Sequence, residues 1–395
     1  MQCIIFSEEY CQPENLFPFT LTRRIQDIRI GILTIREKWE LMLKLPSYDK
    51  WEGDYKEGDR SVTIDSKINE GHYLLVHSNI IPTPALAKAV ISLEPGQFLT
   101  HPIAGAIAFH FHSSDVTSLH KIRVRETISF QDDTPKIVYP WDIFHLNDTA
   151  MRLDFDLLTK DKRSAPISPT NKVSNEEQVF IEEGASVEHA IINAVTGPVY
   201  IGRNALVMEG TTIRGPLAVC EDAVIKMGSR IYGATTIGPA CTAGGEIKNT
   251  VMMGYSNKAH DGYLGDSVIG EWCNIGAGSS ASNIKNNAGE VLVYSPASEG
   301  NKAMTGIKCG LLMGDYSRAS INSSFNTGTV VGVSCSIFGS GLLPKYIPNF
   351  SWGADGIRKY DYDKSIRDIR NWKKLKDVVL SEREENILKY IYDNY

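Results

Sequence analysis

The sequence predicts a two-part protein, an α/β domain followed by a parallel β-solenoid, from three observations. Glycine is unevenly distributed, since 24 of the 33 glycines lie between Gly197 and Gly341. Aliphatic residues recur at every sixth position in the same region. A polar stretch at 160–175 separates this region from a first part that is poor in glycine. A chain of 395 residues is long enough for two or three domains.

The six-residue period is the strongest of these signals. It runs through Ile201, Val207, Ile213, Val219, Ile225, Ile231, Ile237 and Ala243. A looser second series comprises Ile307, Met313, Ala319, Phe325, Val331, Ile337 and Leu343. Helices repeat every 3.6 residues and strands every two, so neither sustains a period of six. A hexapeptide repeat is typical of a β-solenoid, in which three hexads make one coil and residues one coil apart stack. Breaks at 244–268 and 285–306 are predicted to be loops.

The first part of the chain mixes strand and helix patterns. Residues 3–6 and 72–76 favour short strands. Residues 25–43 and 84–93 have the apolar spacing of amphipathic helices. Together they predict an α/β domain over residues 1–155.

The remaining boundaries follow from composition. We expect a linker at 156–178, the solenoid at 179–350 and a helical tail at 351–395. Ser381 and Glu384 have the spacing of a capping box, which predicts that a terminal helix begins there. This helix is expected to pack on the solenoid.

Composition argues against several classes of protein. The net charge is −6 and no long basic run is present, so we expect no nucleic-acid partner. No apolar run is long enough for a transmembrane helix and the N-terminus lacks the pattern of a signal peptide. Seven scattered cysteines without a C-x-x-C pair favour reduced thiols over disulfides or zinc. A cytoplasmic protein without a membrane partner is therefore expected.

The first break in the repeat holds the strongest candidate site. His260 lies there beside Tyr263, and imidazole is a suitable general base near neutral pH. Lys248 follows Arg230 by three hexads, one predicted coil, so the two cations are expected to stack and clamp a phosphate. The alternative is an ordinary surface loop.

The same segment resembles the left-handed β-helix acyltransferases, above all the acetyltransferase half of the bifunctional enzyme of UDP-N-acetylglucosamine synthesis. That family has a Lys, then His-x-x-Tyr-Leu-Gly-Asp, then Asn-Ile-Gly-Ala-Gly, then a further Asn. The corresponding residues here are Lys248, His260 with 263–266, 274–278 and Asn283. Stretches such as KMGSRIYGATTIGP and FNTGTVVGVSCSIFGSG look like a Bacteroidetes variant of this enzyme, with a shorter chain.

The resemblance implies catalytic roles. His260 would be the base that deprotonates the sugar amine. Asn283 is the second predicted catalytic residue. Together with Tyr263 and Asn274, it would hold the sugar and the acetyl thioester. No metal takes part in this step.

The resemblance also implies binding sites and assembly. Arg230 and Lys248 would bind the sugar phosphate, and Ala277 would line the groove for coenzyme A. Acetyl-CoA would be the cosubstrate, and the chain would form a homotrimer with sites shared between neighbours.

By position, the first domain would correspond to the family's nucleotidyltransferase, which is Rossmann-like. The expected glycine-rich phosphate loop is replaced by 7–11 (SEEYC), and two carboxylates would repel a triphosphate. The family's metal-binding Asp is also missing, because 77–79 (HSN) follow the central strand. The segment 16–20 (LFPFT) with Arg23 and Arg24 resembles the sugar-phosphate-facing segment, so these two arginines are candidate phosphate ligands.

Three functions stay open. The favoured function is acetyl transfer from acetyl-CoA to an amino-sugar 1-phosphate, similar to glucosamine 1-phosphate. A sugar-1-phosphate nucleotidyltransferase using UTP or dTTP, alone or combined with acetyl transfer, is the alternative, and it would need Mg²⁺. A non-catalytic scaffold that binds sugar nucleotides is the third. His110 and His112 alternate on a predicted strand without a third ligand, so no metal site is predicted there.

Overall fold

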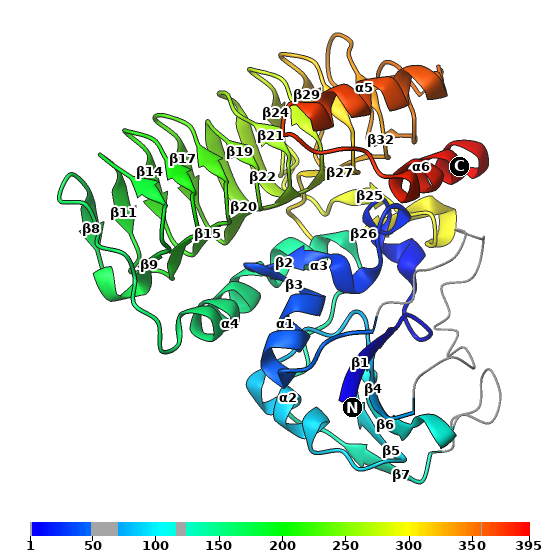
Figure 1. The fold of residues 1–395 in the computed structure, drawn as a ribbon. Coiled ribbons are helices and arrows are strands. Elements are labelled where there is room, and N and C mark those ends of the chain that lie inside the picture. The colour runs from blue at the N-terminus through cyan, green and yellow to red at the C-terminus, as the bar shows by residue number, and fades with distance from the viewer. Residues whose placement is uncertain (1, 49–69, 116–123, 357) are drawn as a thin grey trace. The chain divides into compact units, whose positions relative to one another are not determined.

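The computed structural model describes residues 2–48, 70–115, 124–356 and 358–395 (Figure 1). The chain divides into two compact units that alternate along the sequence. The first comprises Met1–Pro13, Arg23–Ile28 and Leu33–Val138, and the second Glu14–Thr22, Arg29–Ile32 and Tyr139–Tyr395. In the described part of the chain, no helix has both the length and the hydropathy needed to span a bilayer.

A five-stranded mixed sheet forms the centre of the first unit, in the order β1-β4-β6-β5-β7. Its strands are β1 (Gln2–Ser7), β4 (His72–His77), β5 (Gln97–His101), β6 (Gly105–His112) and β7 (Glu126–Ser129). β1 and β4 are parallel, with helix α1 (Ile35–Leu43) between them in sequence, whereas β6 runs antiparallel to β4. Both predicted strands and the Rossmann-like start are confirmed, and α2 (Pro84–Ile91) confirms the second predicted helix.

The predicted helix over 25–43 is wrong in its first half. The Thr34 side chain accepts a hydrogen bond from the Glu37 N–H, and the Glu37 carboxylate accepts one from the Thr34 N–H, so this capping box starts α1 at Ile35. Gly31 has a φ of +73°, which a helix cannot continue through. The preceding residues form η3 (Ile25–Asp27), β2 (Arg29–Ile30) and β3 (Leu33–Thr34).

A parallel β-solenoid makes up most of the second unit, with three faces per coil (Figure 1). The first face contains β9 (Val179–Ile181), β12 (Val199–Ile201), β15 (Leu217–Val219), β18 (Thr235–Ile237), β27 (Leu311–Met313), β30 (Thr329–Val331) and β32 (Tyr346–Ile347). The second contains β10 (Ser186–Val187), β13 (Leu206–Val207), β16 (Val224–Ile225), β19 (Thr242–Ala243), β21 (Asn257–Lys258), β23 (Asn274–Ile275), β28 (Arg318–Ala319) and β31 (Ser336–Ile337). The third contains β8 (Lys172–Ser174), β11 (Ile191–Asn193), β14 (Thr212–Arg214), β17 (Arg230–Tyr232), β24 (Ser280–Ala281) and β29 (Ser324–Phe325). Two long strands, β20 (Glu246–Gly254) and β22 (Tyr263–Glu271), run from the third face onto the first.

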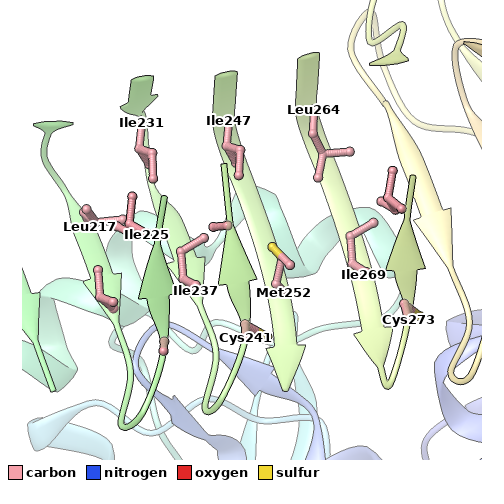
Figure 2. Close-up of a cluster of buried hydrophobic side chains, with 14 of the residues drawn as sticks. Leu217, Ile225, Ile231, Ile237, Cys241, Ile247, Met252, Leu264, Ile269 and Cys273 are labelled. Carbon is pink, nitrogen blue, oxygen red and sulfur yellow. The ribbon is translucent and has the colours of Figure 1, made fainter. Parts of the chain in front are cut away.

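The repeating aliphatic residues line the core of the solenoid, as predicted (Figure 2). Those of the first series, from Ile201 to Ala243, are at most 3% exposed. Ile213 pairs with Ile231, which is three hexads further along the chain, and this pairing confirms the predicted stacking. The second series holds from Met313 onward, but Ile307 is 53% exposed, because the solenoid resumes only at β27.

The two predicted loops differ from each other. The first break, at 244–268, is no loop, because β20 and β22 continue the coil with a repeat shorter than three hexads. Ile231 pairs with Ile247, and Ile247 in turn pairs with Leu264. The second break does leave the solenoid, as the antiparallel hairpin of β25 (Leu292–Tyr294) and β26 (Lys302–Met304).

The second unit also contains the helices α3 (Pro140–His145), α4 (Asn147–Thr159), α5 (Tyr362–Lys374) and α6 (Glu382–Asn394). At α4, the Asn147 amide donates to the Ala234 carbonyl at 2.8 Å, which ties this helix to the solenoid just before β18. The predicted capping box at Ser381 is present, and the Tyr316 hydroxyl donates to Glu384 at 2.9 Å. The tail therefore contains α5 and α6 and packs on the solenoid.

Candidate active site

The third face carries two outward rows of polar and charged groups across β17, β20 and β22. Strand pairing places Arg230, Glu246 and Tyr263 in one row and Tyr232, Lys248 and Gly265 in the next. Successive side chains of a strand alternate between its faces, so the residues between the rows point into the core. We call these two rows the site face.

Arg230 and Lys248 do not stack directly, because this coil is shorter than the repeat. Arg230 instead lies beside Glu246, with Nε to Oε2 at 3.8 Å, and Lys248 lies beside Tyr232, with Nζ 5.8 Å from the ring centre. The Tyr232 hydroxyl donates to Glu246 Oε1 at 2.7 Å, and this hydrogen bond raises the pKa of Tyr232. Both cations still occupy adjoining rows of one surface, and the Arg230 side chain is 53% exposed.

His260 lies on the turn between the second and third faces, and its imidazole forms no hydrogen bond within the described part of the chain. Beneath the turn, Lys258 is 1% exposed, and its ammonium donates to the carbonyl of Gly244 at 3.2 Å and to that of His260. Burial lowers the pKa of Lys258 to about 8. Gly262 is required here, since its φ is +124° and a Cβ would lie 1.9 Å from the Ser279 carbonyl oxygen. The turn is therefore held in place from below.

A groove of about 550 Å³ follows this edge of the solenoid. Its lining residues are Met208, Lys226, Met227, Gly245, Ala259, His260, Asp261, Ala277 and Gly278. The predicted base, His260, and the predicted coenzyme A contact, Ala277, therefore share one groove. Small residues on the inner turns and methionines along one wall suit an extended, partly apolar ligand.

Tyr263 and Asn283 also come together. The Asn283 Nδ2 donates to the Tyr263 hydroxyl at 3.1 Å and to Asp266 at 2.5 Å. Burial and the charge of Asp266 raise the pKa of Tyr263 to about 12, so the phenol is protonated near neutral pH. Asn274 is placed elsewhere, on the second face between Asn257 and Arg318.

In the first unit, charged and polar groups of the loop after β1 are bonded to other groups of the same unit. Glu8 is 5% exposed, and its carboxylate accepts a hydrogen bond from the Ile25 N–H at 2.7 Å and pairs with Arg24 at 3.0 Å. The N–H groups of Glu9 and Cys11 donate to the Ser7 hydroxyl and the Glu8 carbonyl. This loop therefore does not present a row of open N–H groups. Phosphate binding by Arg23 and Arg24 stays a prediction.

The histidines of β6 have local partners. His110 contacts the Leu93 carbonyl and His72, and His112 contacts the Ser114 hydroxyl. Among the described residues, no group of three or more His, Cys, Asp or Glu side chains is arranged to hold a metal ion.

The amino-acid sequence is similar to those of known proteins. Residues 3–163 match the family described as sugar nucleotidyl transferase. The chain is 28% identical over 209 residues to the bifunctional protein GlmU of Methanocaldococcus jannaschii, across 53% of this chain and 44% of that one. The chain is therefore similar in sequence to the bifunctional GlmU proteins.

A second relative has a more explicit name. The bifunctional sugar-1-phosphate nucleotidylyltransferase/acetyltransferase of Sulfurisphaera tokodaii is 28% identical over 184 residues, across 44% of this chain and 42% of that one. The chain thus spans less than half the length of these relatives. The solved UDP-N-acetylglucosamine acyltransferase of Francisella novicida is 14% identical, covers 58% of this chain and 88% of that chain, and has a TM-score of 0.20.

Four residues around the site had no role assigned from the sequence: Tyr232, Glu246, Lys258 and Asp266. Tyr232 and Glu246 would have been found by pairing the strands with the shortened coil, because both lie in the outward rows. Lys258 occupies a repeat position, since it pairs with Ala243 of the preceding coil, and a buried lysine is itself unusual there. Asp266 falls inside the quoted Tyr-Leu-Gly-Asp motif, although nothing in the sequence shows its partners.

Proposed function

We propose that the solenoid part of this chain catalyses acetyl transfer from acetyl-CoA to the amine of an amino-sugar 1-phosphate in cytoplasmic sugar-nucleotide synthesis. One observation carries the proposal. An exposed imidazole, His260, stands at a groove directly beside a face that carries Arg230, Lys248 and Tyr263. A base, two cations and a hydroxyl in one place suit a substrate with an amine and a phosphate.

The reaction assigns one task to each group. The sugar amine attacks the thioester carbonyl while the His260 imidazole takes its proton. The N–C bond forms and the C–S bond breaks, and the protonated His260 returns its proton to the sulfur, so that coenzyme A leaves as a thiol. Arg230 and Lys248 hold the phosphate, and the small Ala277 leaves room in the groove for the pantetheine arm of coenzyme A. Most of the expected rate enhancement comes from positioning and proton transfer.

We also propose that the chain works as a homotrimer. His260 and its groove lie on an open outer edge, which would exclude water better if a neighbouring solenoid covered it. Sedimentation velocity at micromolar concentration tests this, and a stable monomer that retains full activity would contradict it.

The activity is tested with the full chain, glucosamine 1-phosphate and acetyl-CoA, by following free thiol release. Glucose 1-phosphate is the matched control, because it keeps the phosphate but offers no amine. We expect thiol release with the amino sugar alone. Equal release with both sugars, or with neither, would reject acetyl transfer to the amine.

The match of residues 3–163 to sugar nucleotidyl transferases supports a second candidate, uridylyl or thymidylyl transfer by the first unit. Such chemistry needs Mg²⁺ beside a triphosphate. The loop after β1 does not fit that complex, because the Glu8 carboxylate is already held by Arg24 and the Ile25 N–H. Pyrophosphate release from UTP or dTTP in the presence of a sugar 1-phosphate decides this second candidate.

A further inference from the structure

A buried carboxylate lies at the edge of the site face and joins two asparagines. Asp266 Oδ1 accepts from Asn249 Nδ2 at 2.7 Å, and Oδ2 accepts from Asn283 Nδ2 at 2.5 Å. Asp266 is only 4% exposed, so these bonds are shielded from water. Asn249 and Asp266 also lie in neighbouring coils, on the paired strands β20 and β22, and both have left-handed backbone conformations.

The carboxylate determines which way the Asn283 amide points. An ionised carboxylate can only accept hydrogen bonds, so the amide nitrogen must face Asp266. Its two N–H groups then donate one hydrogen bond to Asp266 and one to the Tyr263 hydroxyl. The Asn283 amide oxygen, which accepts no hydrogen bond within the described part of the chain, remains as an acceptor for a ligand.

The same contact determines what Tyr263 can offer. Its oxygen accepts from Asn283, so its O–H proton is directed elsewhere as a donor. The Tyr263 side chain lies over Gly265, where a Cβ would come within 2.2 Å of the Tyr263 hydroxyl and 2.6 Å of Cζ. Glycine at 265 therefore lets the phenol reach Asn283.

We propose that Asp266 is a positioning residue that sets the hydrogen-bond polarity of the site. Through it, Asn283 accepts and Tyr263 donates. A suitable substrate must place an N–H or O–H donor against Asn283 and an oxygen acceptor against Tyr263. A protonatable amine beside an oxygen-rich sugar phosphate meets both requirements. This inference rests on the proposed function. It adds the residue that determines where the substrate must carry a hydrogen-bond donor and where an acceptor.

Asp266→Asn tests the proposal, since it keeps the size and removes the obligate acceptor. The amide introduced in this variant can donate to the Asn283 oxygen, so the Asn283 amide can rotate by half a turn. Its nitrogen, a donor, then faces the substrate in place of its oxygen, an acceptor. We expect kcat/KM for glucosamine 1-phosphate to fall roughly 10-fold or more, with the KM for acetyl-CoA nearly unchanged. Asn249→Gly is the matched control, because it removes the other partner of Asp266 and leaves the Asn283 contact; its kinetics should change less than about twofold.

A double-mutant cycle separates positioning from a merely structural role. If Asp266 acts through Asn283, then Asp266→Asn should cause little further loss in an Asn283→Ala background. Additive losses, or unchanged kinetics of Asp266→Asn, would overturn the proposal. Should Asp266→Asn melt early, Gly265→Ala provides a second test, since it displaces the Tyr263 hydroxyl from Asn283 without touching Asp266, and it should raise the KM for glucosamine 1-phosphate.

The kinetics of the wild type and of Asp266→Asn distinguish a failure of the proposed function from a failure of the positioning role. If the wild-type chain transfers no acetyl group to glucosamine 1-phosphate, the proposed function is rejected, and the polarity argument with it. If the wild type is active and Asp266→Asn matches it in every kinetic constant, only the positioning role is rejected.

Discussion

The solenoid and the first unit use their charged side chains in opposite ways. On the solenoid, Arg230 and Lys248 stand on an outward face, and the Arg230 side chain is about half exposed. In the first unit, Glu8 is buried against Arg24, and the pair closes the loop after β1. The ion pairs of Arg230 are long, at 3.8 Å to Glu246 and 3.9 Å to Asp261, and half of its side chain stays open to an anion from solution. Glu8 and Arg24 are instead paired at 3.0 Å and are largely buried.

The difference follows from how each unit is stabilised. The core of the solenoid is built from the repeating aliphatic residues and their buried apolar neighbours, so the charged groups on the outward face lie outside it. The loop after β1 has no glycines and holds itself together with side-chain contacts. A repeated core therefore frees a surface for chemistry, while an irregular loop uses polar groups to fix its own shape.

The largest effect is expected from a charge placed in the repeated core of the solenoid. Ile225 is fully buried, so Ile225→Asp would place an unpaired carboxylate in a core one residue wide. We expect the free energy of unfolding to fall by about 4 kcal/mol or more. Val195→Asp, at a solenoid position that is 67% exposed, is the control and should change it by less than about 0.5 kcal/mol. Equal effects measured by denaturant unfolding would contradict the inward register.

The second test concerns the chemistry on the solenoid edge. His260→Ala should lower kcat for acetyl transfer by roughly 10²–10⁴-fold, because a positioned base contributes about that factor. The affinity for coenzyme A, measured by calorimetry, should barely change. His189→Ala removes another exposed solenoid histidine and should leave kcat as it is. Full activity of His260→Ala would place the base elsewhere.

The third test asks whether the first unit is sensitive to acid through His77. Burial and the nearby Lys136 lower the pKa of His77 to about 4, below its ordinary value of 6.5. The unfolded chain therefore binds more protons between these pH values, and stability falls as the pH drops from about 6.5 to 4. His77→Gln should reduce this loss by up to about 3 kcal/mol. Urea melts of both proteins at pH 7 and pH 4.5 measure the difference, and parallel pH profiles would count against it.

The smallest expected effect is on substrate binding at the site face. Arg230→Ala and Lys248→Ala should each raise KM for the sugar phosphate about 10-fold with little change in kcat, because both bind ground and transition states alike. Arg203→Ala, an exposed solenoid arginine paired with Glu221, is the control and should leave KM unchanged. A large drop in kcat with an unchanged KM would show that the cations act on the transition state instead.

Periodic parts of the chain were predictable and irregular ones were not. The hexad register from Ile201 to Ala243 followed from spacing alone, since each aliphatic residue has only one place in a narrow core. The same reasoning was wrong at Arg230 and Lys248, because the coil there is shorter than three hexads and shifts their partners. The helix expected over 25–43 was too long, because Gly31 and the Thr34 cap interrupt a pattern that remains apolar.

The hexad period was enough to predict the solenoid and its core residues, and the quoted motifs predicted where the candidate site lies. The pairing of polar groups became visible only in the folded chain: Arg230 with Glu246, Asp266 with Asn283, and Glu8 with Arg24. The physical reason is that burial of one aliphatic residue per hexad is a local, repeated requirement that is visible as a period. A hydrogen bond between distant polar side chains depends instead on the length of each coil and the path of each turn, and neither leaves a period in the sequence.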